Sequence, residues 1–230
     1  MRAVITLMLC LSFGIAFSQS KQISAPQFSR ISLSGPFKVT LVKADKSRAE
    51  IDYKGIDPDD VVIDCSGDEL EIRIRHRSFF NFDDRHDRDG KRAVVTIYYT
   101  SLKSIDTKEG VSLHANETIT ADRLKLKSRM GSELNLDLKV NTLALESSMG
   151  SEVDLSGVAE DFELRASMGT DVDASQLKCQ DVSVSASMGA DVKVFAERTL
   201  DASANFGASV TCKGNPTKKH TSGTFGADFN

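Results

Sequence analysis

The sequence predicts an all-β fold, a β-solenoid with coils of about 19 residues that is closed by an irregular N-terminal β cap. Two observations predict it. A dipeptide of Met or Phe followed by Gly recurs at spacings of 19, 19, 20, 18 and 19 residues. Polar and apolar residues alternate around each dipeptide, which is typical of strands and not of helices. The six dipeptides begin at Met130, Met149, Met168, Met188, Phe206 and Phe225.

The composition fits a folded protein and excludes one function class. Apolar residues make up 40% of the 230 residues and charged residues 27%, which allows a substantial core. The formal net charge is -4, so the chain lacks the basic surface of a nucleic-acid-binding protein. We therefore expect no nucleic-acid partner.

The first 18 residues have the pattern of a secretory signal peptide. Arg2 precedes an apolar run that is short for a membrane span, and a small-residue cleavage site precedes Gln19. The alternatives are an uncleaved membrane anchor and a lipid anchor on Cys10, although Leu9 stands where a lipobox needs a small residue. We expect an exported chain, in the periplasm or at the cell surface, with no membrane span after residue 18.

One domain is expected over residues 19–230. Residues 28–107 would form the N-terminal β cap, because they alternate like strands without a regular repeat, and solenoids need atypical ends to cover their first coil. Residues 108–230 would form the repeat solenoid. The candidate strands of the cap lie at residues 31–33, 37–41, 49–53, 70–74 and 93–99.

Within each coil, the alternation predicts which side chains face inward. In the third copy one parity carries apolar residues from Phe162 to Ala174 and includes Met168. We therefore expect all six Met and Phe residues of the dipeptides to be buried and to contact one another from coil to coil. The glycines would mark bends, and short segments such as 156–161 would form the returns. Residues 108–127 would be a transitional coil in which Glu-Gly replaces Met-Gly.

These features together resemble a bacterial protein family. The N-terminal signal, the stretch FSRISLSGPFKV from Phe28 to Val39 and the glycine-punctuated repeats are similar to the "putative auto-transporter adhesin, head GIN domain" family. The resemblance implies an exported, all-β domain like a right-handed parallel β-helix, with an adhesive role and no accepted active site. The repeats run to Asn230 with no translocator after them, so self-export across an outer membrane is not expected.

One row of carboxylates is the candidate binding site. Two residues after successive glycines come Glu133, Glu152, Asp171 and Asp191. Stacked strands lie about 4.8 Å apart, so these carboxylates are expected to be near neighbours. Such an acidic ladder could hold Ca²⁺, a cationic partner or sugar hydroxyls. It could also be a solvated face that keeps the stack soluble.

The other reactive residues form no recognisable catalytic or metal motif. The charged loop at residues 81–92 looks like a calcium loop, but Arg85 and Thr96 stand where an EF-hand needs acids. The four histidines have no metal spacing, and Ser-Met-Gly is not a G-x-S-x-G elbow. We expect no enzyme activity and no cofactor. Three cysteines follow the signal and are expected to be buried thiols with at most one disulfide: Cys65, Cys179 and Cys212.

The favoured function is an exported, non-enzymatic, adhesin-like binding module of the bacterial cell envelope or surface. Its partner would be a surface glycan or an envelope protein. The first alternative is a structural envelope protein that self-associates through an open last coil at residues 225–230. The second is a polysaccharide-active β-helix enzyme, which a deep cleft with clustered carboxylates would favour.

Overall fold

The computed structural model describes residues 20–24, 27–53, 56–75 and 92–230. These residues contain no α-helix, and η1 (Pro58–Asp60) is a single 3-10 turn. The predicted signal peptide and most of the predicted 81–92 loop lie outside the described residues. Among the described residues, no helix is long and apolar enough to cross a membrane.

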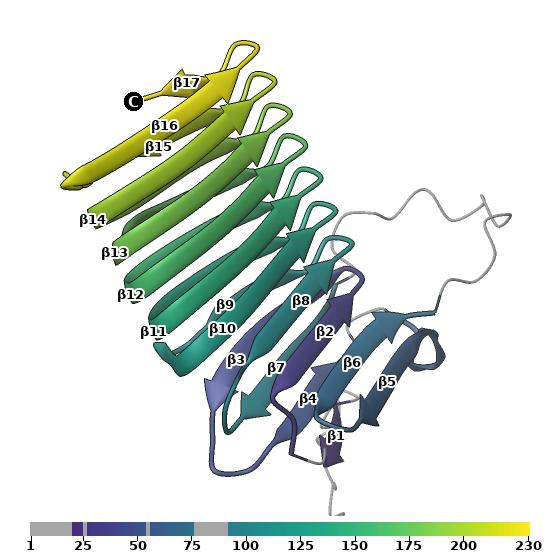
Figure 1. Cartoon of the computed structure of the whole chain (residues 1–230). Coiled ribbons are helices and arrows are strands. Elements are labelled where there is room, and N and C mark those ends of the chain that lie inside the picture. Colours follow the sequence, from purple (N-terminus) through teal and green to yellow (C-terminus); the bar gives the residue numbers. More distant parts are fainter. Residues whose placement is uncertain (1–19, 25–26, 54–55, 76–91) are drawn as a thin grey trace, which may run out of the picture.

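The second half of the chain is a stack of parallel coils (Figure 1). Each long strand pairs in parallel with the next at an offset close to one repeat, as in the pairs Leu134–Val153 and Val153–Val172. The fold class predicted from the repeat is therefore confirmed. The stacked strands are β10 (Ile119–Arg129), β11 (Glu133–Ser148), β12 (Glu152–Ser167), β13 (Asp171–Ser187) and β14 (Asp191–Asn205).

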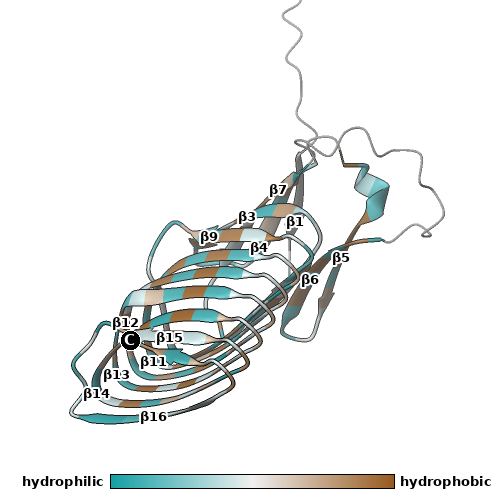
Figure 2. Cartoon of the chain, turned by 90° about the horizontal axis from the view of Figure 1, so that it is seen from above, coloured by the Kyte–Doolittle hydropathy of each residue, from teal (hydrophilic) through white to brown (hydrophobic). Residues whose placement is uncertain are grey.

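The core lies inside the coils. Hydrophobic and hydrophilic residues alternate along the long strands of the stack (Figure 2). Inward positions repeat from coil to coil, so equivalent side chains stack on one another; Leu143, Phe162 and Val182 form one such column and are at most 3% exposed. Burying an aliphatic or aromatic side chain of this size contributes about 1.5–3 kcal/mol. The stack is thus held by columns of apolar contacts together with the parallel strand pairing.

The segment expected to form a return, residues 156–161, is part of strand β12. Residues 156–161 pair in register with residues 137–142 of the preceding coil, so β12 continues around the bend. The bend passes through Gly157, whose φ is 105°. A Cβ atom there would lie 2.0 Å from the carbonyl oxygen of Leu138, so only glycine allows this backbone approach. The bend thus interrupts the apolar alternation of the sequence without interrupting the strand pairing.

The N-terminal region adds coils to the same stack, but out of chain order. β2 lies between β6 and β8, and β3 lies between β7 and β9, all in parallel. The coil made by β2 and β3 is thus inserted between two coils that come later in the sequence, which conceals the repeat. The strands are β2 (Arg30–Ser34), β3 (Phe37–Lys43), β6 (Glu69–Ile74), β7 (Ala93–Tyr99), β8 (Ser104–Lys108) and β9 (Ser112–Ala115).

Short strands complete the two ends of the stack. At the N-terminal end, β4 (Arg48–Asp52) pairs antiparallel with β7, and β1 (Ser20–Ser24) pairs antiparallel with β4. β5 (Val61–Ser66) pairs antiparallel with β6. At the other end, β16 pairs with β14 and β17 pairs with β15. The bounds of these last strands are β15 (Ser209–Cys212), β16 (Lys218–Thr224) and β17 (Asp228–Phe229).

Candidate functional site

The chain turns one corner of each coil at the Met-Gly or Phe-Gly dipeptide. Both residues adopt the left-handed conformation: φ is 59° at Met149 and 68° at Gly150. Two successive left-handed residues make the tight turn that joins two strands, a turn that normally favours Asn-Gly or Gly-Gly. The corners are locked together, because the N–H of each dipeptide glycine before Gly226 donates to the Met or Phe carbonyl of the next coil at 3.0–3.1 Å.

The six Met and Phe side chains of these corners point outward, so the prediction that they are buried is wrong. Ala166 and Thr170 are at most 2% exposed, whereas Met168 between them is 48% exposed. The positive φ at Met168 turns its Cβ out of the coil and resets the alternation at the next residue. We call the six residues the apolar ridge; their exposed fractions are Met130 44%, Met149 47%, Met168 48%, Met188 54%, Phe206 59% and Phe225 77%.

Small polar side chains fill the space inside the corner that the methionines were expected to fill. Ser147 and Thr170 share a hydrogen bond of 2.6 Å, and the Thr170 hydroxyl also donates to the carbonyl oxygen of Ser151 at 2.7 Å. Their hydroxyls are buried and satisfied, so they stabilise the corner without a large core side chain. The sequence signal was present: Ser, Thr or Ala stands two residues before and two residues after the Met or Phe of most dipeptides.

The acidic ladder lies on the outer face just after the ridge. Strand pairing places Glu133, Glu152, Asp171 and Asp191 opposite one another in four successive coils, and all four are exposed. Glu133 accepts a hydrogen bond from the Ser112 hydroxyl at 3.0 Å. Within the described part of the chain, no ion pair involves these four carboxylates, and no three Asp, Glu, His or Cys residues are grouped to hold a metal ion.

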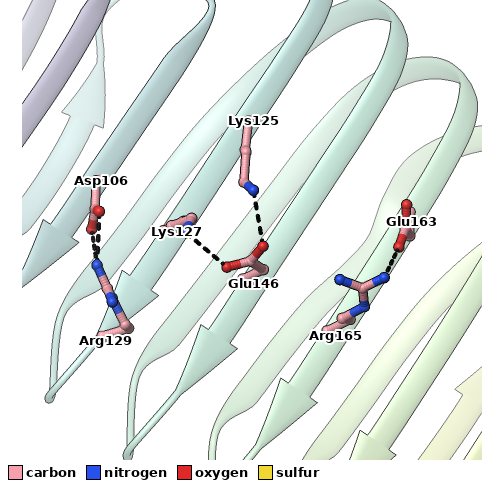
Figure 3. Close-up of polar contacts among 7 residues, drawn as sticks. All are labelled: Asp106, Lys125, Lys127, Arg129, Glu146, Glu163 and Arg165. Carbon is pink, nitrogen blue, oxygen red and sulfur yellow. Dashed lines mark hydrogen bonds and ion pairs between the residues drawn. The ribbon is translucent and has the colours of Figure 1, made fainter. Parts of the chain in front are cut away.

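The outer face on the other side of the ridge balances its own charges (Figure 3). Lys125 and Lys127 approach the two carboxylate oxygens of Glu146 at 3.0 and 3.1 Å. The hydrogen bond from Lys125, with that from Lys127, lowers the pKa of Glu146. Two further pairs lie on this face, Arg129–Asp106 at 2.7 Å and Arg165–Glu163 at 2.6 Å. The ridge therefore separates a face whose acidic side chains form ion pairs within the chain from the row of four ladder carboxylates, which form none.

A polar groove of about 330 Å³ opens beside the ladder, where the repeat is irregular. The coil that begins at Met168 has 20 residues and the following coil has 18. The strand register shifts in this stretch, and Ala174 and Ser175 are both buried, as expected for a β-bulge. The residues that line the groove are Asn135, Asp154, Leu155, Ser156, Asp173, Ser175, Gln176 and Lys213.

The two aspartates of the polar groove differ in their proton affinity. Partial burial, together with the negative charge of Asp173, raises the pKa of Asp154. Partial burial also acts to raise the pKa of Asp173, but hydrogen bonds from Ser175 and the charge of Lys193 bring it below its usual value. Lys213 reaches across from the following coils and donates to the Ser175 hydroxyl at 2.9 Å. The groove can accept hydrogen bonds from hydroxyls or amines and donate from Lys213.

The sequence profile of one protein family matches residues 27–216, and that family is described as "Putative auto-transporter adhesin, head GIN domain". The chain belongs to this family. The match covers the N-terminal coils as well as the Met-Gly repeats of this GIN-domain protein. The curated proteins include no match to the chain.

Solved structures of other proteins have the same fold as this GIN-domain protein. A putative adhesin from Bacteroides fragilis is 19% identical with a TM-score of 0.79, and the alignment covers 91% of this chain and 94% of that chain. A putative adhesin from Parabacteroides distasonis is 15% identical with a TM-score of 0.69, covering 92% and 96%. A putative lipid binding protein from Parabacteroides distasonis is 14% identical with a TM-score of 0.65, also covering 92% and 96%.

Neither the cysteines nor the described histidines of the GIN domain belong to the ridge or the ladder. Cys65, Cys179 and Cys212 are free thiols; Cys179 is buried as predicted, and the other two are half-buried. Burial, with a smaller contribution from the charge of Glu197, raises the pKa of Cys179 to about 12. His114 shares a hydrogen bond of 3.1 Å with the Thr40 hydroxyl.

Proposed function

We propose that this GIN-domain protein is an exported, non-enzymatic, adhesin-like binding module of the cell envelope or surface, and that the apolar ridge is its binding surface. Membership of a family described as adhesin heads supports the general role. The observation that carries the proposal is the exposure of six large apolar side chains in one continuous row. Soluble monomers seldom expose contiguous apolar patches of more than a few hundred Å² unless the patch binds something.

The backbone conformation strengthens this interpretation, because the ridge residues are costly for folding. A left-handed conformation costs a residue with a Cβ on the order of 1 kcal/mol, and Asn or Gly would serve the turn better. The chain nevertheless places Met or Phe at six such corners, with φ between 53° and 59°. Side chains that lower stability and contact little of their own protein are those expected at a binding surface.

The chemistry of the ridge favours an envelope protein over a glycan as its partner. Methionine is flexible and polarizable, and Met-rich surfaces adapt to apolar side chains of protein partners. The alternative of self-association through the last coil is disfavoured by β16, because its exposed Lys218 and Lys219 are the kind of residue that keeps an edge strand from pairing.

The decisive test compares two double variants of the purified protein. In Met149→Asn/Met168→Asn the ridge is interrupted at two neighbouring coils, while Ser183→Asn/Ser185→Asn introduces asparagine at two exposed positions outside the ridge and the ladder. Binding to cells of the producing bacterium is measured by flow cytometry, and protease accessibility on intact cells locates the protein. We expect the ridge variant to bind at least about tenfold more weakly and the control to bind like the parent. Equal binding by all three proteins would contradict the proposal.

A second candidate function is glycan binding in the polar groove. The β-bulge supports it, because irregular coils of solenoids often carry binding sites, and the groove offers both acceptors and the Lys213 donor. Asp154→Asn should then weaken binding to a glycan array without changing ridge-dependent binding to cells. If the protein instead cleaved such a glycan, the parent would release reducing ends from it and Asp154→Asn would release fewer.

A further inference from the structure

We propose that the apolar ridge and the acidic ladder together dock a helical polypeptide segment with one apolar face and a row of Lys or Arg beside that face. The proposal rests on the role of the ridge as a binding surface and adds the chemistry of the partner.

The charges on the two sides of the ridge point to a basic partner. On one side, Lys125 and Lys127 both form ion pairs with Glu146 within the chain, which leaves no negative charge uncompensated there. On the other side, the four ladder carboxylates are exposed and take part in none of the ion pairs among the described residues. A partner that lies along the ridge meets an uncompensated row of negative charge on one flank only. Complementary charge on the partner would favour association and set its orientation.

The acidic ladder also argues against an anionic membrane as the partner. A lipid surface would meet the ridge and the ladder at the same time, because Gly169 and Thr170 alone separate Met168 from Asp171. Anionic headgroups would therefore be repelled where the apolar side chains insert. A segment that carries Lys or Arg next to its apolar residues satisfies both rows.

The spacing of the coils fits a helix that runs along the ridge. Successive coils are about 4.8 Å apart, and successive turns of an α-helix are 5.4 Å apart, so apolar residues one turn apart can meet one corner after another. Six corners span about 24 Å, which equals roughly 16 residues of helix. The small mismatch is absorbed by methionine, whose unbranched side chain adjusts its rotamers readily. Helix-on-apolar-surface docking of this kind is a common mode of recognition.

The test uses model peptides and the protein of residues 19–230. The probe is an 18-residue Leu/Lys peptide with Leu at i, i+3, i+4 and i+7; its controls are a Leu/Glu peptide of the same pattern and a scrambled Leu/Lys peptide. Fluorescence anisotropy gives the affinity and circular dichroism the helicity. We expect the patterned Leu/Lys peptide to bind and to gain helix, and both controls to bind at least about tenfold more weakly.

Two variants assign the binding to the two rows. Met149→Asn/Met168→Asn should lose about tenfold in affinity at any salt concentration. Glu152→Gln/Asp171→Asn should lose about tenfold in 50 mM NaCl and less in 500 mM, because salt already screens the interaction there. Ser183→Asn/Ser185→Asn should match the parent, and the melting temperatures of all variants identify any that fail to fold.

Several results would overturn the inference. One is equal binding of the patterned and the scrambled peptide. Another is unchanged peptide binding by the ridge variant and by the ladder variant. A third is tighter binding of the protein to vesicles that contain phosphatidylglycerol than to the peptide. Dimerisation of the parent in sedimentation, lost in Met149→Asn/Met168→Asn, would identify a second copy as the occupant and also overturn it. If peptides fail but the ridge variant still loses cell binding, this inference falls while the proposed function stands.

Discussion

Phe206 and Phe225 stack with their ring centroids 5.4 Å apart and their planes 3° from parallel, although both side chains point away from the core. The hydrogen bond from the Gly207 N–H to the Phe225 carbonyl, 3.1 Å long, holds the two corners one above the other. The rings therefore lie in a row that the backbone has already ordered. A partner that binds the ridge meets a backbone whose shape is fixed by the coils, so only the side chains of the ridge lose conformational freedom on binding.

Replacing a ridge methionine by asparagine should stabilise the protein. Met168→Asn removes an exposed apolar side chain and places at φ 59° a residue that tolerates the left-handed conformation, so we expect a gain of about 0.5–1 kcal/mol in the free energy of unfolding. Met168→Val should lose at least as much, because a β-branched residue is strained there. Urea denaturation measures both. A loss of several kcal/mol in Met168→Asn would mean that the side chain is buried after all.

The sequence predicts the stack well and its corners poorly. The repeat spacing and the alternation identify the parallel coils, and the ladder residues Glu152 and Asp171 pair as their positions require. The alternation fails at Met168, because Met168 and Gly169 are both left-handed and turn the chain at the corner. Met168 therefore points outward although its parity predicts an inward side chain. The inserted coil of β2 and β3 could not be predicted either, since its neighbours are set by contacts between segments far apart in the sequence.

Gly157 and Gly150 should respond differently to the same substitution. Gly157→Ala places a Cβ 2.0 Å from the carbonyl oxygen of Leu138, so the strand pairing at the bend must open, and we expect a loss of several kcal/mol. Gly150→Ala meets no atom within 4 Å and carries only the strain of φ 68°, a cost of about 1 kcal/mol. Thermal denaturation of the two variants checks the order. Equal losses would show that the bend has room for a side chain.

Cys179 should be unreactive in the folded protein. Its thiol is buried, and its pKa of about 12 leaves almost no thiolate at pH 8. We expect iodoacetamide to modify Cys179 in the folded protein many times more slowly than in urea, as read by peptide mass spectrometry. A Cys179→Ala variant identifies the peptide. Modification at the same rate in both conditions would mean that the coil opens readily at this position.

Calcium should have no specific effect on the acidic ladder. The described residues contain no group of three metal-binding side chains, and four carboxylates in a row on a solvated face present no closed coordination sphere. We expect millimolar CaCl₂ to shift the melting temperature no more than NaCl of equal ionic strength. A larger shift in CaCl₂ that disappears in Glu152→Gln/Asp171→Asn would instead establish the ladder as a cation site.

Asp154 should make folding weaker as the pH rises. Its pKa is raised in the folded protein by partial burial and by the charge of Asp173, so the native state binds this proton more tightly than the unfolded chain does. The free energy of unfolding then falls as pH rises from the ordinary aspartate pKa, near 4, to the raised value, and the loss is complete at neutral pH. Asp154→Asn removes this term. We expect the variant to melt above the parent at pH 7 and close to it at pH 3, where both side chains are uncharged. A variant that melts below the parent at pH 7 would show that the neighbouring groups stabilise the Asp154 carboxylate. It would then contradict the raised pKa.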